Sequence, residues 1–151
     1  MGFYSVAGRT TATAATADNF AGALWNPAST KTLWVVEIAF AKTVATVDNQ
    51  GIVRISARGT VTTSATPDTD NAWDRDGTPA TAAVLDILYS AQPTIAAPYL
   101  KRWNLPAAIG SGAIFTFPGP GIKVPAGTGL GVATPVAVIL QPLDLSVTWY
   151  E

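Results

Sequence analysis

The chain contains no cysteine and no histidine. Without cysteine a disulfide scaffold is excluded. Without histidine, the Ser-His and Cys-His catalytic dyads are excluded, as is every zinc site that needs imidazole. The carboxylates expected on strands, Glu37, Asp86 and Asp144, are not spaced so that any two must share a cleft, as a glycosidase would require. We therefore expect a protein that is not an enzyme and that holds no cofactor.

Charge is scarce as well. Only 13% of the residues are charged, whereas about a quarter is usual for a soluble domain. The net charge is −1, and the basic residues are scattered, with only Lys101 and Arg102 adjacent. No basic face is available for nucleic acid or an anionic membrane, so we expect neither as a partner. Coverage by other subunits is one reason for so uncharged a surface.

Long apolar runs are also missing. The longest, 132–140, is interrupted by Thr134 and Pro135 and is far shorter than a membrane span. The N-terminal twenty residues lack the basic and apolar regions of a signal peptide. We therefore expect a product that stays in the cytoplasm where it is made, or that leaves by a route this chain does not encode.

What the sequence does contain is apolar alternation with a period of two. In 53–62, Val53, Ile55 and Val61 alternate with arginine, serine and threonine, which is typical of a half-buried antiparallel strand. Leu143, Leu145, Val147 and Trp149 alternate in the same way at the end of the chain. Further short strands separated by Gly/Pro turns are expected at 33–43, 114–117, 122–124, 130–132 and 136–140.

Strict alternation in 33–43 would put Trp34, Val36, Ile38 and Phe40 on one face and Leu33, Val35, Glu37 and Ala39 on the other. A turn signal at 48–51 favours a long hairpin over 33–63. In such a hairpin Glu37 would lie across from Arg54 or Arg58.

Two regions allow more than one interpretation. Residues 79–90 could begin a helix after Thr78–Pro79 or form a strand; we favour the strand because the surrounding segments are all β. Residues 9–24 are rich in threonine and alanine and cannot form a core of their own. We expect 1–24 to be an extended N-terminal arm or edge strand, followed by one all-β domain at 25–151, an antiparallel β-sandwich or jelly roll.

Three stretches carry a family resemblance: LWNPASTKTLWVVEIAF, GIKVPAGTGLGV and the closing LSVTWYE. Their order resembles small virion proteins of tailed bacteriophages, which open with an L-x-N-P turn and close with a G-I-x-V-P-A-G turn and a V-T-x-x-E strand. Within that group the nearest function is that of a capsid decoration, or cement, protein. The resemblance covers roughly 24–63 and 114–151.

The resemblance implies a homotrimeric jelly roll that binds the major capsid protein between capsomers, on the capsid surface of a virion assembled in the host cytoplasm. Because interface energy concentrates in large aromatic residues, we expect interface anchors at Trp25, Trp34, Trp149 and Tyr150. The alternative function is a receptor-binding domain of a phage fibre or head spike that recognises a glycan, with aromatic rings as its platform.

One acidic segment, 67–79, could hold Ca²⁺ through Asp68, Asp70, Asp74 and Asp76. The calcium-loop template fails, because Ala72 and Ala83 stand where carboxylates are needed. We therefore favour a solvated acidic loop without a bound metal.

Overall fold

The computed structural model describes the chain except for residues 1, 13–15, 28–30, 67–80 and 140. The described residues form strands and connecting segments, and none of them lies in a helix. The strands are β1 (Phe3–Arg9), β2 (Phe20–Asn26), β3 (Leu33–Lys42), β4 (Asp48–Ala57), β5 (Thr60–Ala65), β6 (Val84–Ala91), β7 (Thr94–Leu105), β8 (Gly112–Thr116), β9 (Ile122–Val124), β10 (Thr128–Ala133) and β11 (Leu143–Tyr150).

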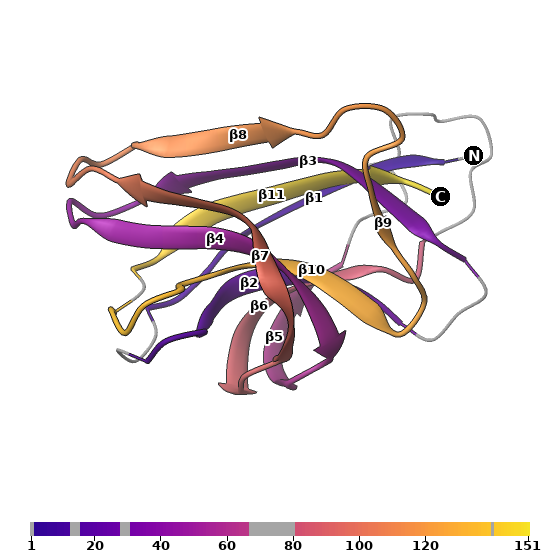
Figure 1. The fold of residues 1–151 in the computed structure, drawn as a ribbon, viewed down its shortest axis with the longest axis horizontal. Helices are drawn as coiled ribbons and strands as arrows, with labels where there is room; N and C mark the ends of the chain where they lie inside the picture. The colour runs from indigo at the N-terminus through magenta and orange to yellow at the C-terminus, as the bar shows by residue number, and fades with distance from the viewer. Residues whose placement is uncertain (1, 13–15, 28–30, 67–80, 140) are drawn as a thin grey trace.

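The strands form two antiparallel sheets packed face to face (Figure 1). The five-stranded sheet has the order β1-β11-β3-β8, with β9 also paired to β3, and the six-stranded sheet has the order β5-β6-β2-β10-β4-β7. Leaving out β5, β6 and β9, each sheet has four strands, in the orders β1-β11-β3-β8 and β2-β10-β4-β7. This is the strand order of a jelly roll built from two Greek keys. The predicted all-β sandwich is confirmed.

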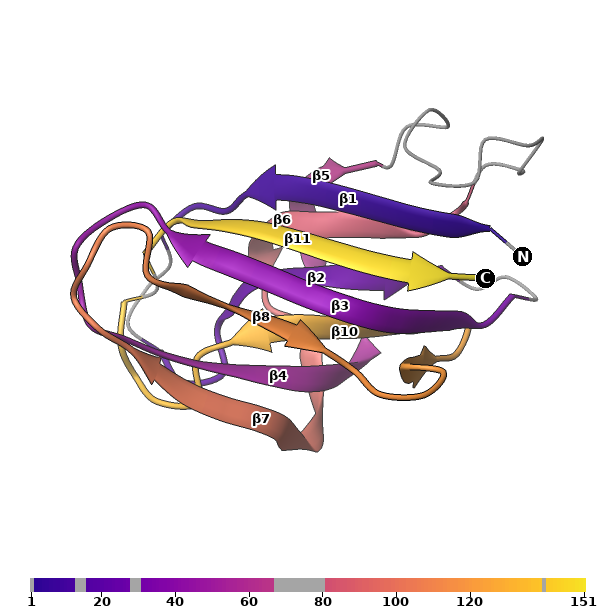
Figure 2. The same ribbon diagram turned by 90° about the horizontal axis from the view of Figure 1, so that it is seen from above.

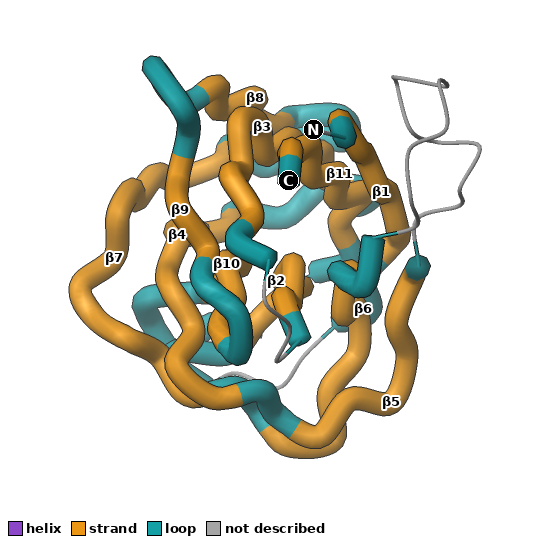
Figure 3. The backbone as a smooth tube through the Cα atoms, turned by 90° about the vertical axis from the view of Figure 1, so that its right-hand side faces the viewer, coloured by secondary structure: helices purple, strands orange, loops and turns teal. Residues whose placement is uncertain are grey.

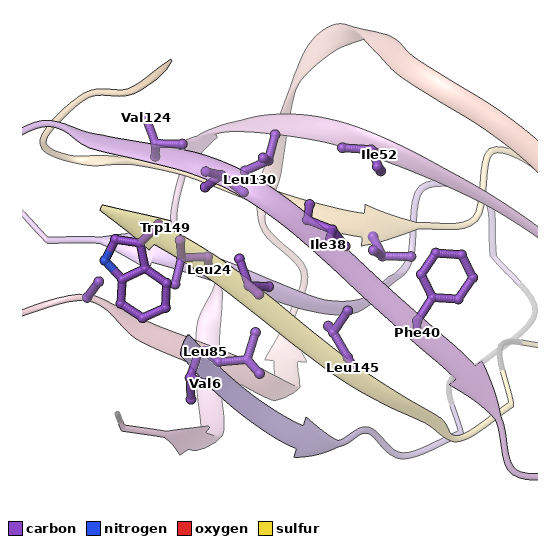
Figure 4. Packing of buried hydrophobic residues seen from close by; sticks show 14 of the residues in the cluster. Val6, Leu24, Ile38, Phe40, Ile52, Leu85, Val124, Leu130, Leu145 and Trp149 are labelled. Atoms are coloured by element: carbon purple, nitrogen blue, oxygen red, sulfur yellow. The ribbon is translucent and has the colours of Figure 1, made fainter. Parts of the chain in front are cut away.

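The core lies between the sheets and follows the alternation seen in the sequence. In β11, Leu143, Leu145, Val147 and Trp149 are buried while the residues between them are more exposed. They pack with residues of both sheets, including Leu24, Ile52 and Leu130 (Figure 4). Burial of these side chains supplies the main driving force for the sandwich. The strand predicted within 79–90 is also confirmed, as β6.

Strict alternation in β3 is a wrong prediction, because the strand contains a β-bulge. Thr148 pairs with Glu37 and Trp149 pairs with Val35, so Val36 has no partner of its own on β11. Leu33, Val35, Ile38 and Phe40 are buried, whereas Val36 and Glu37 are both only partly buried. A bulge inserts one residue and reverses the faces that follow it. Both side chains therefore lie on the outer face.

The predicted hairpin over 33–63 is also wrong. β3 belongs to the five-stranded sheet and β4 to the six-stranded sheet, because the segment 43–47 crosses between the sheets. The turn signal at 48–51 lies inside β4. Glu37 therefore does not face either arginine: Arg54 donates to the Lys123 carbonyl and Arg58 binds Asp86. In a jelly roll, strands adjacent in sequence are mostly placed in opposite sheets.

The N-terminal segment is not an extended arm in its described part. β1 is an edge strand, as one of the two predicted alternatives had it, and pairs with β11 along its length (Figure 2). β2 lies between β6 and β10 in the middle of the six-stranded sheet and is buried throughout. The boundary expected at residue 24 therefore falls inside a central strand. The small residues that suggested low complexity, Ala21, Gly22 and Ala23, fit a strand covered on both faces.

β2 is covered on both faces because the six-stranded sheet curls around a second, smaller core (Figure 3). β4 pairs with β7 and β5 pairs with β6, so the four strands form one long ribbon that bends at 58–59 and 92–93. Val84, Tyr89, Ile95 and Tyr99 of this ribbon pack in the second core with Val53 and Ile55 of β4 and with Phe20 and Trp25 of β2. Arg58, which lies at the bend between β4 and β5, donates two hydrogen bonds to the buried Asp86 of β6, at 2.9 and 2.7 Å.

The bend of the ribbon requires glycine at position 59. A Cβ atom there would lie 2.1 Å from the Ala91 carbonyl oxygen, which is part of the backbone and cannot move aside alone. We expect Gly59→Ala to lower the free energy of unfolding by about 1 to 3 kcal/mol, measured by urea denaturation. Gly8→Ala is the control and should cost less, because its added methyl group would meet the side chains of Ile87 and Leu85 and no backbone atom.

Candidate functional site

The predicted interface residues separate into two buried and two accessible side chains. Trp149 is 0% exposed and stacks on Tyr4 with ring centroids 5.7 Å apart. Trp25 is 8% exposed and packs in the second core, with the Arg58 guanidinium 5.9 Å from its ring centroid. Both rings are used within their own chain, and this burial is incompatible with a role as interface anchors.

Trp34 and Tyr150 lie together on the outer face of the five-stranded sheet, on the neighbouring strands β3 and β11. Their rings stack with centroids 6.4 Å apart and planes 12° from parallel. Lys123 on β9 approaches the Trp34 ring at 6.0 Å, and the Tyr150 hydroxyl donates to the Pro120 carbonyl at 2.8 Å. Both side chains are half-buried, so this aromatic pair remains accessible, and its predicted role stays a prediction.

The acidic segment with Asp68, Asp70, Asp74 and Asp76 lies outside the described residues. Of the strand carboxylates, Asp144 pairs with Arg9 and Asp86 with Arg58. Glu37 is on the opposite sheet from Asp86. Among the described residues no group of three or more His, Cys, Asp or Glu side chains could hold a metal ion, and the same residues include no helix of the length and hydropathy needed to cross a membrane.

One end of the sandwich exposes aliphatic side chains on its loops. The connections β3–β4, β7–β8 and β10–β11 meet at the left of Figure 1, and their segments 43–47, 106–111 and 134–142 contain no charged residue. Four aliphatic side chains on these connections are exposed: Val47, Ile109, Val136 and Ile139. We call this set the apolar loop end. Clustered exposed apolar side chains usually mark a surface that another molecule covers.

The loops at this end are tied to one another. Lys42 donates through its backbone to Ser111 and through its Nζ atom to the Pro106 carbonyl at 3.1 Å. The Thr43 hydroxyl donates to the Pro142 carbonyl at 2.8 Å. Fixed loops lose less conformational entropy on association than mobile ones. The apolar loop end is therefore presented in a largely preformed arrangement.

Beneath this end lies a buried polar cluster. Lys42 and Asp48 have fully buried side chains, and their Nζ and Oδ2 atoms are 3.6 Å apart. The side chains of Gln50 and Thr46 and the indole nitrogen of Trp103 are buried without hydrogen-bond partners among the described residues. Burial raises the pKa of the Asp48 carboxyl, while the Lys42 ammonium opposes that rise. The pair holds the end of β3 close to the start of β4.

The outer face of the five-stranded sheet carries two shallow depressions. One, of about 560 Å³, has Ala39, Ala41 and Ile114 in its lining and is bordered by the Arg9–Asp144 ion pair. The second, of about 470 Å³, is lined by Phe3, Glu37, Phe117 and neighbouring residues. The Arg9 guanidinium lowers the pKa of the Asp144 carboxyl. Both members of that pair are well exposed, so their contribution to stability is small.

The sequence predicts interface anchors at aromatic residues, and none of these lies at the apolar loop end. Its signal was present: three turn segments, 43–47, 106–111 and 134–142, in which valine or isoleucine occurs without any charge. The sequence does not show that these three segments lie close together in the folded protein. That proximity follows from the crossing of strands between the sheets.

Comparison with known proteins gives no match. No protein-family model, no curated protein and no solved structure matches it.

Proposed function

We propose that this protein is a structural virion component that decorates and stabilises a phage capsid, binding the major capsid protein as a homotrimer. Three features support the proposal: the jelly-roll strand order, which is common in capsid proteins, the low content of charged residues, and the virion-protein motifs in the sequence.

The observation that carries the proposal is the apolar loop end. Val47 and Ile109 are 70% and 71% exposed, on loops without charge. Burying such side chains between copies gains roughly 25 cal/mol per Å² of apolar area, and the loop segments themselves contain no charged group that would have to be desolvated. We assign the apolar loop end to the contact between copies in the trimer.

The aromatic pair Trp34–Tyr150 suits the contact with the shell. It lies beside the C-terminus, away from the apolar loop end (Figure 1). One aromatic pair per copy is a weak contact, but three copies held in a trimer bind together through a high effective concentration. Trp25 and Trp149 are left out of this interface because their own chain buries them.

The oligomeric state tests the proposal directly. In sedimentation velocity at tens of micromolar we expect the wild-type protein to have three times the 15.6 kDa mass of the chain. The double variant Val47→Asp/Ile109→Asp should sediment as a monomer, because charges at the contact would have to be desolvated.

Ile114→Asp is the matched control, since Ile114 is also 71% exposed but lies on β8 at the outer face of the five-stranded sheet. We expect it to remain trimeric. A monomeric wild type, or a trimer lost only in Ile114→Asp, contradicts the assignment. Location on the capsid is tested by electron microscopy of purified particles with this chain labelled by an antibody.

A further inference from the structure

The second depression of the five-stranded sheet has a polar row at its base. Glu37 on β3 is paired across the sheet with Thr148 on β11 and with Thr116 on β8. All three side chains contribute to the lining. The carboxylate therefore lies between two hydroxyl groups on three adjacent strands, on the face seen in Figure 2.

The β-bulge of β3 is what places Glu37 in this row. Without the extra residue, Val36 and Glu37 would point to opposite faces, and one of them would enter the core. With it, both line the depression. Bulges often re-aim side chains beside binding sites. A carboxylate that a β-bulge places in a depression is therefore a candidate ligand-binding group.

The Glu37 carboxylate is unpaired within the part of the chain that the structure describes. Among the described residues, Glu37 has no hydrogen-bond or ion-pair partner, although Arg9, Arg58 and Lys31 all engage other carboxylates. Thr116 is exposed and Thr148 is only partly buried, so both hydroxyls are accessible. Three polar groups in a row are thus available to an external molecule.

Apolar residues complete the depression. Phe3 from β1 contributes an aromatic side chain to the lining, while Phe117, which follows β8, borders the depression and packs against the main core. The volume of about 470 Å³ falls in the range of small-molecule sites. A carboxylate accepts two hydrogen bonds at once, and each threonine hydroxyl both donates and accepts. Aromatic rings cover the apolar C–H face of a flat ligand. The lining contains no cation, so an anionic ligand is disfavoured.

We propose that this depression binds a neutral pyranose, with Glu37 accepting hydrogen bonds from two neighbouring sugar hydroxyls and the Phe3 side chain beside the ring carbons. A single ring has the vicinal hydroxyls that the row Thr148–Glu37–Thr116 can engage. This site gives the protein a glycan-binding capacity that is independent of the proposed coat function.

The test is saturation-transfer NMR and calorimetry on the full chain with methyl glycosides of glucose, galactose, mannose, rhamnose and N-acetylglucosamine. We expect at least one of them to bind with a millimolar Kd. Glu37→Gln should weaken that binding roughly tenfold, the size of one lost hydrogen bond to a charged group. Asp144→Asn, the same chemical change in the other depression, should leave the Kd unchanged.

Three results overturn the proposal: no glycoside of the panel binds, Glu37→Gln binds as well as the wild type, or tetramethylammonium displaces the sugar with higher affinity. The last result would assign the depression to a cation instead. Glu37→Gln is not at the apolar loop end, so its sedimentation should equal that of the wild type. Failure of sugar binding and failure of trimer formation are therefore separate outcomes.

Discussion

Replacing Trp149 with alanine is expected to lower the free energy of unfolding by about 3 to 5 kcal/mol. The ring is fully buried between the sheets (Figure 4). It stacks on Tyr4. The change removes a large apolar side chain and leaves a cavity that the paired strands around it cannot close. Urea denaturation followed by circular dichroism measures the loss.

Trp149→Phe serves as the matched control. It keeps an aromatic ring and removes an indole N–H that has no hydrogen-bond partner among the described residues, so it should lose clearly less stability than the alanine variant. The folded variants should keep the sedimentation behaviour of the wild type. A Trp149→Ala protein with unchanged stability and a lost trimer would instead make Trp149 an interface residue.

Replacing Lys42 with methionine is expected to cost about 3 to 5 kcal/mol of unfolding free energy at pH 7. The Lys42 and Asp48 side chains are fully buried, with Nζ and Oδ2 3.6 Å apart. Methionine fills a similar volume but leaves the Asp48 carboxylate buried without a positive partner, and the hydrogen bond to Pro106 is lost. Urea denaturation of the variant and the wild type gives the difference.

This loss should depend on pH. Burial already raises the pKa of Asp48 in the folded protein, and without Lys42 nothing opposes that rise. A carboxyl whose folded pKa exceeds its unfolded pKa is destabilising once the pH rises past the unfolded value. The deficit relative to wild type should therefore be largest at neutral pH and shrink as the pH falls toward the ordinary range of aspartate.

The double variant Lys42→Met/Asp48→Leu distinguishes charge from packing. Replacing both members of a buried ion pair by apolar residues is often neutral or stabilising, so it should recover most of the loss. If the double variant is as unstable as Lys42→Met, the pair acts through its hydrogen bonds and shape rather than through an uncompensated charge.

Much of the strand content could be predicted, because alternation is a local property. The inward residues of β11 agree with the pattern, whereas the strand found as β6 was expected from its β surroundings and not from alternation. Alternation failed in β3, where a single bulge moves Val36 and Glu37 to the same face. A bulge has no periodic signal, since it shows only as one residue too many between two regular stretches.

The candidate surfaces were less predictable. Aromatic residues were expected at an interface, but large rings are equally suited to a core, and nothing local distinguishes Trp149 from Trp34. The apolar loop end depends on three turns that are distant in sequence. The row Thr148–Glu37–Thr116 depends on strand register across three strands.

The sequence by itself determined that this chain forms pleated strands with apolar inner faces, and it excluded histidine and cysteine chemistry. Only the tertiary structure decided which strands share a sheet, which tryptophans are enclosed and where Glu37 points. The physical reason is that alternation sets only which side chains share a face. Pairing between distant strands is chosen by burial of all the apolar faces at once, which no short segment encodes.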